Sequence, residues 1–128
     1  MSYIKHRADE SLEDYLETIL LLQRKNGHVR SIDIANELNF TKASVSVAMK
    51  NLREKEYITM ADTGHILLTA SGMLRAENVL ERHKVLSDWL ISLGVSVEAA
   101  LEDACKVEHD ISEETFEAIK KAYMDSKN

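Results

Sequence analysis

Three side chains that commonly bind metal ions lie close together in the last quarter of the sequence: Cys105, Glu108 and His109. If this segment is a helix, positions i, i+3 and i+4 fall on one face. Thiolate, carboxylate and imidazole then form a mixed donor set, which suits a first-row divalent metal. The spacing therefore predicts part of a metal site on a helix.

Further donors lie earlier in the chain. Asp14 and Glu17 are three residues apart in the first predicted helix, and His83 lies in a long predicted helix before Cys105. They complete the predicted site if the first helix packs against the one that carries Cys105. Each has an ordinary alternative, since Asp14 can close a capping box with Ser11 and the other two can be solvent-exposed.

The donors of the last quarter also have ordinary alternatives. Cys105 follows an alanine and can be a small buried hydrophobic residue. Glu108 and His109 can be surface groups near a helix C-terminus, where a protonated histidine is favourable. The predicted site therefore depends on all of these spacings taken together.

The periodicity of apolar residues predicts the elements that must hold these donors. The expected elements are helices at residues 11–25, 31–38, 41–55, 70–93, 97–109 and 113–124, with a hairpin of two strands at residues 57–60 and 65–69. Ser11, Ser31 and Thr41 are expected to cap the first three helices. In the second helix, Ile32 is expected to face the core.

Helix, short helix, tight turn, longer helix and hairpin follow one another in the order of a winged helix-turn-helix. The predicted fold is mainly α, with three helices and a two-stranded wing in a DNA-binding domain at residues 1–72. A helical metal-binding and dimerisation domain is expected at residues 73–128. Apolar residues of this second domain supply the expected dimer surface: Trp89, Leu90, Leu93, Val97, Ala100, Leu101 and Ala104.

The third helix is the expected DNA-reading element, because it must bury one stripe and offer the other to the major groove. Small outward residues allow close approach, hydroxyl groups can bond phosphates or base edges, and Ala43 and Val47 can touch thymine methyl groups. The expected DNA-binding residues are Arg30, Thr41, Lys42, Ala43, Ser44, Ser46, Val47 and Lys50. The alternative is a winged helix that contacts only other proteins.

The net charge of −6 is unevenly distributed over the 128 residues. Residues 28–82 carry seven basic and seven acidic side chains, whereas residues 83–128 carry five and ten. A local basic face can therefore bind phosphate although the chain is acidic. The lack of a long apolar run and of a secretory signal predicts a cytoplasmic protein with no membrane partner. Without a phosphate-binding glycine loop or an HExxH motif, we expect neither an enzyme nor a small-molecule substrate.

Five segments of the chain together carry a family resemblance: Glu13 to Glu17, Asp33 to Ala35, Leu67 to Gly72, Arg82 with His83, and Ala104 to His109. They resemble the diphtheria toxin repressor family, and in particular its short manganese-transport-regulator branch. It implies a homodimer that binds Mn²⁺ or Fe²⁺, then grips a palindromic operator in double-stranded DNA and represses metal-uptake genes. The ligands that it implies are Asp14, Glu17, His83, Cys105, Glu108 and His109.

The ligand set resembles two branches of the family at once. The manganese branch is similar at Asp14 and Glu17 but has a carboxylate where Cys105 stands. The iron branch has a cysteine there and a methionine at the position of Asp14. A thiolate favours softer metals, including Fe²⁺, Co²⁺ and Zn²⁺, and additional carboxylates favour Mn²⁺. We therefore expect Fe²⁺ or Mn²⁺ as the cofactor, with Co²⁺ or Zn²⁺ as substitutes.

Three other functions are compatible with the same residues. A metal-independent winged-helix regulator would respond to a small molecule, and a chelator would not change its affinity for an operator. A metalloenzyme would also use cysteine, histidine and glutamate. A structural dimer would carry a winged helix that binds no DNA.

Overall fold

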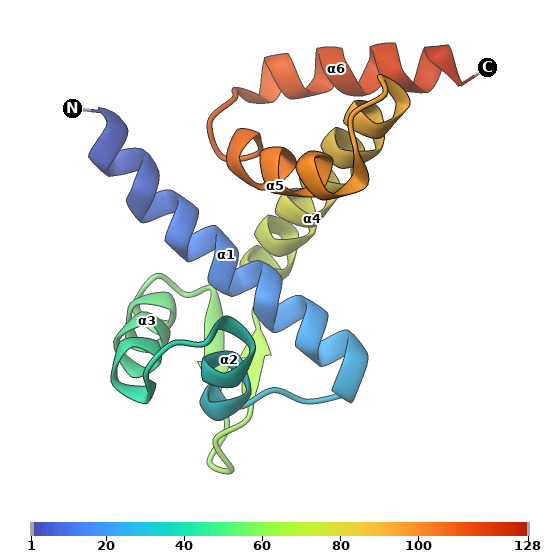
Figure 1. Ribbon diagram of the computed structural model, residues 1–128. Coiled ribbons are helices and arrows are strands. Elements are labelled where there is room, and N and C mark those ends of the chain that lie inside the picture. Colours follow the sequence, from blue (N-terminus) through green and yellow to red (C-terminus); the bar gives the residue numbers. More distant parts are fainter. Residues whose placement is uncertain (1, 128) are drawn as a thin grey trace. The chain divides into compact units, whose positions relative to one another are not determined.

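The computed structural model describes residues 2–127, and the side chains of residues 11–127. Over this range the predicted order of elements is observed (Figure 1): α1 Ser2–Asn26, α2 Ser31–Leu38, α3 Lys42–Glu54, β1 Ile58–Met60, β2 Ile66–Leu68, α4 Ala70–Ser92, α5 Val97–Val107 and α6 Glu113–Ser126. The predicted fold class is confirmed. The elements divide into two compact units, residues 3–77 and 78–128, and the division falls within α4. None of the described helices is long and apolar enough to cross a membrane.

The N-terminal unit is built on aliphatic side chains from α1, α2, α3 and the hairpin. Its largest buried side chains include Leu16, Ile19, Leu20, Val29, Ile34, Val45, Met49, Leu52, Ile58 and Ile66. The two strands pair antiparallel, with Ile58 opposite Leu68 and Met60 opposite Ile66. α3 contacts both α2 and β1, so the hairpin and the two short helices form one packed group (Figure 1).

The first helix is longer than its predicted range. It begins at Ser2 and not at Ser11, which lies well inside it. The reason is local, because residues 2–10 contain neither glycine nor proline and nothing in them stops a helix. The predicted capping box of Ser11 and Asp14 is therefore wrong, and capping does not explain Asp14.

The second helix also departs from prediction at its start. Arg30 is its N-cap residue in place of Ser31, and the Arg30 N–H donates to Asp33 Oδ2 at 2.9 Å. Ile34 is buried, whereas Ile32 is 40% exposed. Two positions apart on a helix differ by roughly 200° around the axis, so only one of the two isoleucines can face the core.

Short contacts join the start of α4 to the residues before β1. Thr69 Oγ1 donates to Glu56 O at 2.7 Å, and Ser71 Oγ donates to the same oxygen at 3.2 Å. The Thr69 N–H donates to Tyr57 O at 3.0 Å. Gly72 packs closely against the backbone of Tyr57, since a Cβ added at Gly72 would be 1.9 Å from Tyr57 O. We call these five residues the wing root, because they fix where the hairpin begins and ends.

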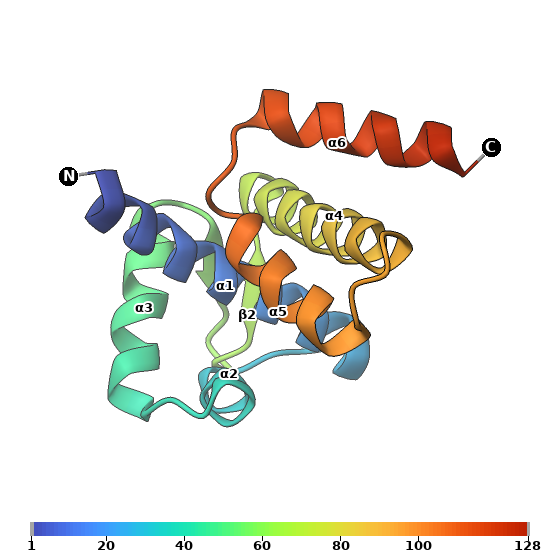
Figure 2. The same ribbon diagram turned by 45° about the horizontal axis from the view of Figure 1, so that its top comes forward.

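The C-terminal unit comprises the second part of α4, with α5 and α6 (Figure 2). Its buried cluster is Val85, Leu86, Ala104 and Phe116, with Trp89, Ile111, Ile119 and Tyr123 packed against it. Serine caps begin both of the later helices. Ser96 Oγ accepts from Ala99 N–H at 3.2 Å, and Ser112 Oγ accepts from Thr115 N–H at 3.1 Å.

The apolar residues predicted to form a dimer surface fall into three groups, of which Trp89 and Leu90 are half-buried. Leu93, Val97 and Leu101 are 63%, 59% and 45% exposed. Ala100 and Ala104 are fully buried within the chain itself, so they cannot present area to a partner. The expectation for these two alanines is wrong, because small side chains on a helix serve close packing inside the chain.

Candidate metal centre and nucleic-acid face

Glu108 is the centre of a cluster of donors in the C-terminal unit. α5 ends at Val107, two residues short of the predicted end, but Glu108 keeps helical backbone angles of φ −57° and ψ −27°. Its side chain is only 1% exposed. One carboxylate oxygen, Oε2, lies 2.9 Å from His83 Nδ1, and the other, Oε1, lies 3.3 Å from His109 Nε2. A buried carboxylate is thus bracketed by two imidazoles from different elements.

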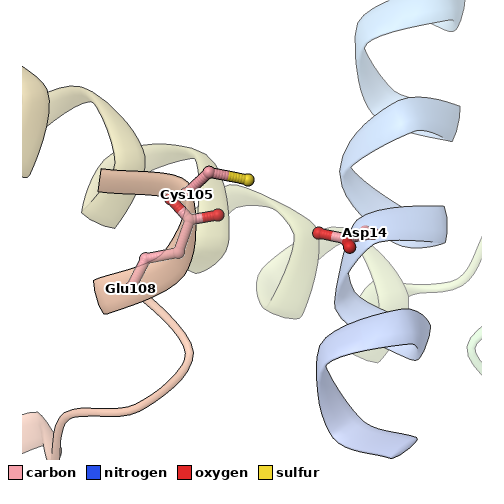
Figure 3. A group of neighbouring side chains, drawn as sticks. All are labelled: Asp14, Cys105 and Glu108. Carbon is pink, nitrogen blue, oxygen red and sulfur yellow. The ribbon is translucent and has the colours of Figure 1, made fainter. Parts of the chain in front are cut away.

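Cys105 lies one helical turn before Glu108. The two side chains project from the same side of the end of α5, and the thiol is exposed (Figure 3). Burying a carboxylate is costly unless it is paired or coordinates a metal. Carboxylate, thiolate and two imidazoles are donors that first-row divalent ions accept. The chemistry of this donor set therefore fits a metal of the predicted class.

Arg82 holds the turn that carries these donors. Its Nη1 donates to Glu108 O at 2.9 Å and to Ile111 O at 3.0 Å, and its Nη2 donates to Glu113 Oε2 at 2.8 Å. The hydrogen bond from Arg82 lowers the pKa of Glu113. The position of Arg82 beside His83 is the one signal in the sequence for this role, and the spacing of donors alone does not reveal it.

Asp14 and Glu17 lie on α1, in the N-terminal unit, while the other four candidate ligands belong to the C-terminal unit. Both acidic side chains are half-buried, and they are three residues apart on a continuous helix. Thr18 Oγ1 donates to the backbone oxygen of Asp14 at 2.8 Å, which adds a side-chain hydrogen bond to this turn of α1. Figure 3 shows the Asp14 carboxylate projecting from α1.

The expected DNA-binding residues all lie on exposed surface. They are Arg30, Thr41, Lys42, Ala43, Ser44, Ser46, Val47 and Lys50. Thr41 caps α3 as predicted, and its Oγ1 accepts from Ser44 N–H at 3.1 Å. Val45, Met49 and Leu52 bury the opposite stripe of α3. Val47 is 62% exposed, so its methyl groups are accessible for contact with thymine methyl groups.

A pair of histidines, His28 and His65, lies near the start of β2, where the sequence pattern indicated no site. The rings of His28 and His65 have centroids 5.2 Å apart. The Ile66 N–H donates to Val29 O at 2.8 Å, which brings the two histidines together. They are 37 positions apart in the chain, so only the fold places them side by side.

Family models match almost the whole chain. The N-terminal DNA-binding domain of iron-dependent repressors matches residues 9–66, and their metal-binding and dimerisation domain matches residues 69–127. The transcriptional regulator MntR of Escherichia coli O157:H7 is 37% identical over 115 residues, which cover 90% of this chain and 74% of the relative. An uncharacterised HTH-type transcriptional regulator of Methanocaldococcus jannaschii is 34% identical over 113 residues, which cover 87% of this chain and 90% of that one.

Solved structures have the same fold. The manganese regulator SloR has a TM-score of 0.76 at 24% identity, and the match covers 86% of this chain and 52% of that one. IdeR of T. acidophilum has a TM-score of 0.73 at 28% identity, covering 87% and 53%. The chain thus spans about half the length of these solved structures.

The expectations of family and general function are thereby confirmed. The matched domains account for DNA and a second copy of the chain as partners, and for a divalent metal as cofactor. The chain belongs to the diphtheria toxin repressor family of metal-dependent DNA-binding transcriptional repressors of metal homeostasis, in its manganese-regulator branch.

Proposed function

We propose that this chain is an Fe²⁺- or Mn²⁺-dependent homodimeric repressor that binds a palindromic operator in the cytoplasm and has no catalytic activity. In this proposal residues 1–72 bind DNA, and residues 73–128 bind metal and form the dimer. The proposed ligands are Asp14, Glu17, His83, Cys105, Glu108 and His109.

One observation carries the metal dependence. Glu108 is buried between His83 and His109, with distances of 2.9 Å and 3.3 Å from its two oxygens to the imidazole nitrogens. α4 and the turn after α5 therefore bring together three side chains that can bind a first-row metal: His83, Glu108 and His109. Their protonation competes with metal binding, so metal affinity falls in acid.

Cys105 bears on which metal the site prefers. Its thiolate favours the softer Fe²⁺, Co²⁺ and Zn²⁺, whereas Asp14, Glu17 and Glu108 supply the oxygen donors that Mn²⁺ prefers. The proposal therefore names Fe²⁺ and Mn²⁺ as the physiological candidates. Co²⁺ and Zn²⁺ are expected to occupy the same ligands in vitro.

The proposed mechanism uses the ligands of α1. Asp14 and Glu17 repel Glu108 when no cation is shared among them, and a divalent ion removes that repulsion. The support for including α1 is the spacing of its two carboxylates and the family resemblance. Binding would then set the separation of the two recognition helices in the dimer, which must be about 34–36 Å to read half-sites one DNA turn apart. A coupling of about 5- to 150-fold in affinity is typical of such an effector.

The decisive experiment titrates a palindromic operator with the protein against a panel of divalent metals, with elemental analysis of the same samples. We expect Fe²⁺ or Mn²⁺ to raise operator affinity and a chelator to abolish the gain. His109→Ala should lose metal binding. His28→Ala replaces an exposed histidine of the N-terminal unit that is not a proposed ligand, and it should retain metal binding. If chelator and metal leave operator affinity unchanged, the proposal is wrong.

Cys105 is tested separately by two substitutions. Cys105→Glu restores the carboxylate of the manganese branch and should shift activation towards Mn²⁺ and away from Co²⁺ and Zn²⁺. Cys105→Ala should weaken activation by every metal. If Cys105→Ala leaves metal-stimulated operator binding unchanged, Cys105 is not a ligand.

A cavity in the N-terminal unit favours one alternative, a regulator that responds to a small molecule. Residues of α1 and α3 line a cavity of about 280 Å³: Ser11, Leu12, Tyr15, Ala48, Asn51, Leu52 and Lys55. Its lining combines apolar side chains with Ser11, Asn51 and Lys55, as in many ligand sites. Ala48→Phe would fill this cavity. A loss of regulation in Ala48→Phe, together with indifference to chelator, would favour this alternative.

A further inference from the structure

Arg75 joins α1 to the wing root inside the N-terminal unit. Its Nη1 donates to Tyr57 Oη at 2.7 Å, and its Nε lies 3.5 Å from Glu13 Oε2. The guanidinium carbon lies 5.4 Å from the centroid of the Tyr57 ring. One side chain of α4 therefore holds both a carboxylate of α1 and the residue that precedes β1.

This linkage is better shielded from solvent than a second ion pair between the same helices. The side chains of Arg75 and Glu13 are 31% and 21% exposed, whereas those of Arg24 and Glu77 are both more than half exposed. Exposed ion pairs contribute little to stability, and charge-assisted bonds with less water around them contribute more. Burial opposes the charge of Arg75, but the hydrogen bond to Tyr57 and the Glu13 carboxylate outweigh it and raise the pKa of Arg75.

Glu13 and Tyr57, the two residues that Arg75 contacts, lie next to a proposed metal ligand and next to the hairpin. Glu13 is the neighbour of Asp14, so a rotation of α1 at Glu13 also moves a proposed ligand. Tyr57 is fixed on its other side by the Thr69 N–H, which donates to its backbone oxygen at 3.0 Å. The hairpin begins at the next residue, Ile58.

We propose that Arg75 is a positioning residue that couples metal binding at Asp14 and Glu17 to the order of the wing. The inference rests on the proposed function, because α1 must carry metal ligands. Arginine suits this role since its planar fork holds its donors in fixed directions, whereas the donors of a lysine ammonium rotate on a flexible stem. As a positioning residue, Arg75 itself contacts neither the ion nor DNA.

The experiment compares full-length wild type with Arg75→Gln, Tyr57→Phe and Arg24→Gln. Arg24→Gln is the matched control, since it makes the same change in the exposed pair between the same two helices. Mn²⁺ affinity is measured by calorimetry, and operator affinity with and without Mn²⁺. Amide hydrogen exchange of residues 58–68 is followed in both states, and circular dichroism checks that each variant is folded.

In wild type and Arg24→Gln, we expect Mn²⁺ to slow exchange in the wing and to raise operator affinity. In Arg75→Gln, Mn²⁺ should still bind with similar affinity, but the slowing should vanish. The Mn²⁺-dependent gain in operator affinity should fall by about fivefold or more. Tyr57→Phe removes only the hydroxyl and should show the same loss in weaker form, which keeps the test valid if Arg75→Gln does not fold.

A second readout needs no metal. In the metal-free protein, a double-mutant cycle of Glu13→Gln and Arg75→Gln should show non-additive effects on thermal stability, because each change removes the same contact.

Three results would overturn the proposal: additive effects in that cycle, full retention of the Mn²⁺ response in Arg75→Gln, or loss of Mn²⁺ binding itself in this variant. Failure of the proposed function is a different result, in which the wild-type operator affinity is indifferent to Mn²⁺.

Discussion

Gly72→Ala is a substitution for which helix propensity and the fold predict opposite signs. Alanine is the better helix former by about 1 kcal/mol, and Gly72 lies in the first turn of α4. The structure predicts destabilisation, because the new Cβ would lie 1.9 Å from Tyr57 O and 2.9 Å from Tyr57 C. Both are backbone atoms, so no side chain can rotate to relieve the clash.

The size of the effect follows from the displacement that the methyl group requires. Moving Tyr57 O from 1.9 Å to ordinary contact at 3.4 Å separates the wing root by about 1.5 Å. The bonds from Thr69 and Ser71, now 2.7–3.2 Å long, would then exceed hydrogen-bonding range. Overpacking costs about 1–3 kcal/mol, and each lost hydrogen bond costs about 1 kcal/mol. With three such bonds lost, and after subtracting the gain in propensity, we expect a loss of about 3–5 kcal/mol in the free energy of unfolding.

The assay is urea unfolding followed by circular dichroism, with the midpoint and slope compared between variants. Ser71→Ala is the matched control at the preceding helical position, because it adds no atom against Tyr57 and removes only one exposed hydroxyl, whose contacts with Glu56 O and Thr69 Oγ1 are both 3.2 Å long. Its unfolding free energy should change by about 1 kcal/mol or less, well below the loss expected for Gly72→Ala. A Gly72→Ala protein as stable as wild type would refute the close-packing account of the wing root.

Four further outcomes are expected. Glu56→Gly should stabilise the fold by about 0.5–1 kcal/mol in urea unfolding, because Glu56 has φ +62° and glycine adopts this region without strain. Arg82→Gln should lower the free energy of unfolding by about 2 kcal/mol. It should also raise the pKa of Glu113, measured by NMR titration, because the hydrogen bond that lowers this pKa is lost. In wild type, the stability that this bond contributes disappears as the pH falls through the lowered pKa. Lys50→Ala should reduce the salt dependence of operator binding by about one unit of slope for each phosphate contact removed, with little change in sequence preference. Saturating the protein with Mn²⁺ at about 100 times its Kd should add about 2.7 kcal/mol of stability in calorimetry, and this increment should shrink in acid as protons compete for the ligands.

Local patterns predicted the elements that depend on neighbours in the chain. Thr41, Ser96 and Ser112 cap helices because each offers an oxygen to an N–H three residues later, which is a short-range fact of sequence. The hairpin around Gly64 is equally local. Local patterns gave a wrong prediction where the same residues are compatible with both the start and the interior of a helix. Ser11 and Asp14 match a capping motif, yet they lie inside a continuing helix.

The faces of the helices required the fold. Ile32 and Ile34 are equivalent in polarity, and only packing in the N-terminal unit selects Ile34 for burial. Ala100 and Ala104 were expected at a dimer surface, but the chain buries them itself. A pattern of apolar residues indicates that one face of a helix must be buried, whereas the tertiary contacts decide which residues bury that face.

The same division holds for the candidate metal centre. The sequence by itself determined the types of donor, their spacing on one helix turn at Cys105, Glu108 and His109, and the family to which they belong. Only the tertiary structure decided that Glu108 is buried between two imidazoles, because His83 comes from α4, 25 positions earlier in the chain. The tertiary structure also placed the Arg75 guanidinium against the hydroxyl of Tyr57, which lies 18 positions earlier in the chain. Spacing along a sequence carries no information about such pairs.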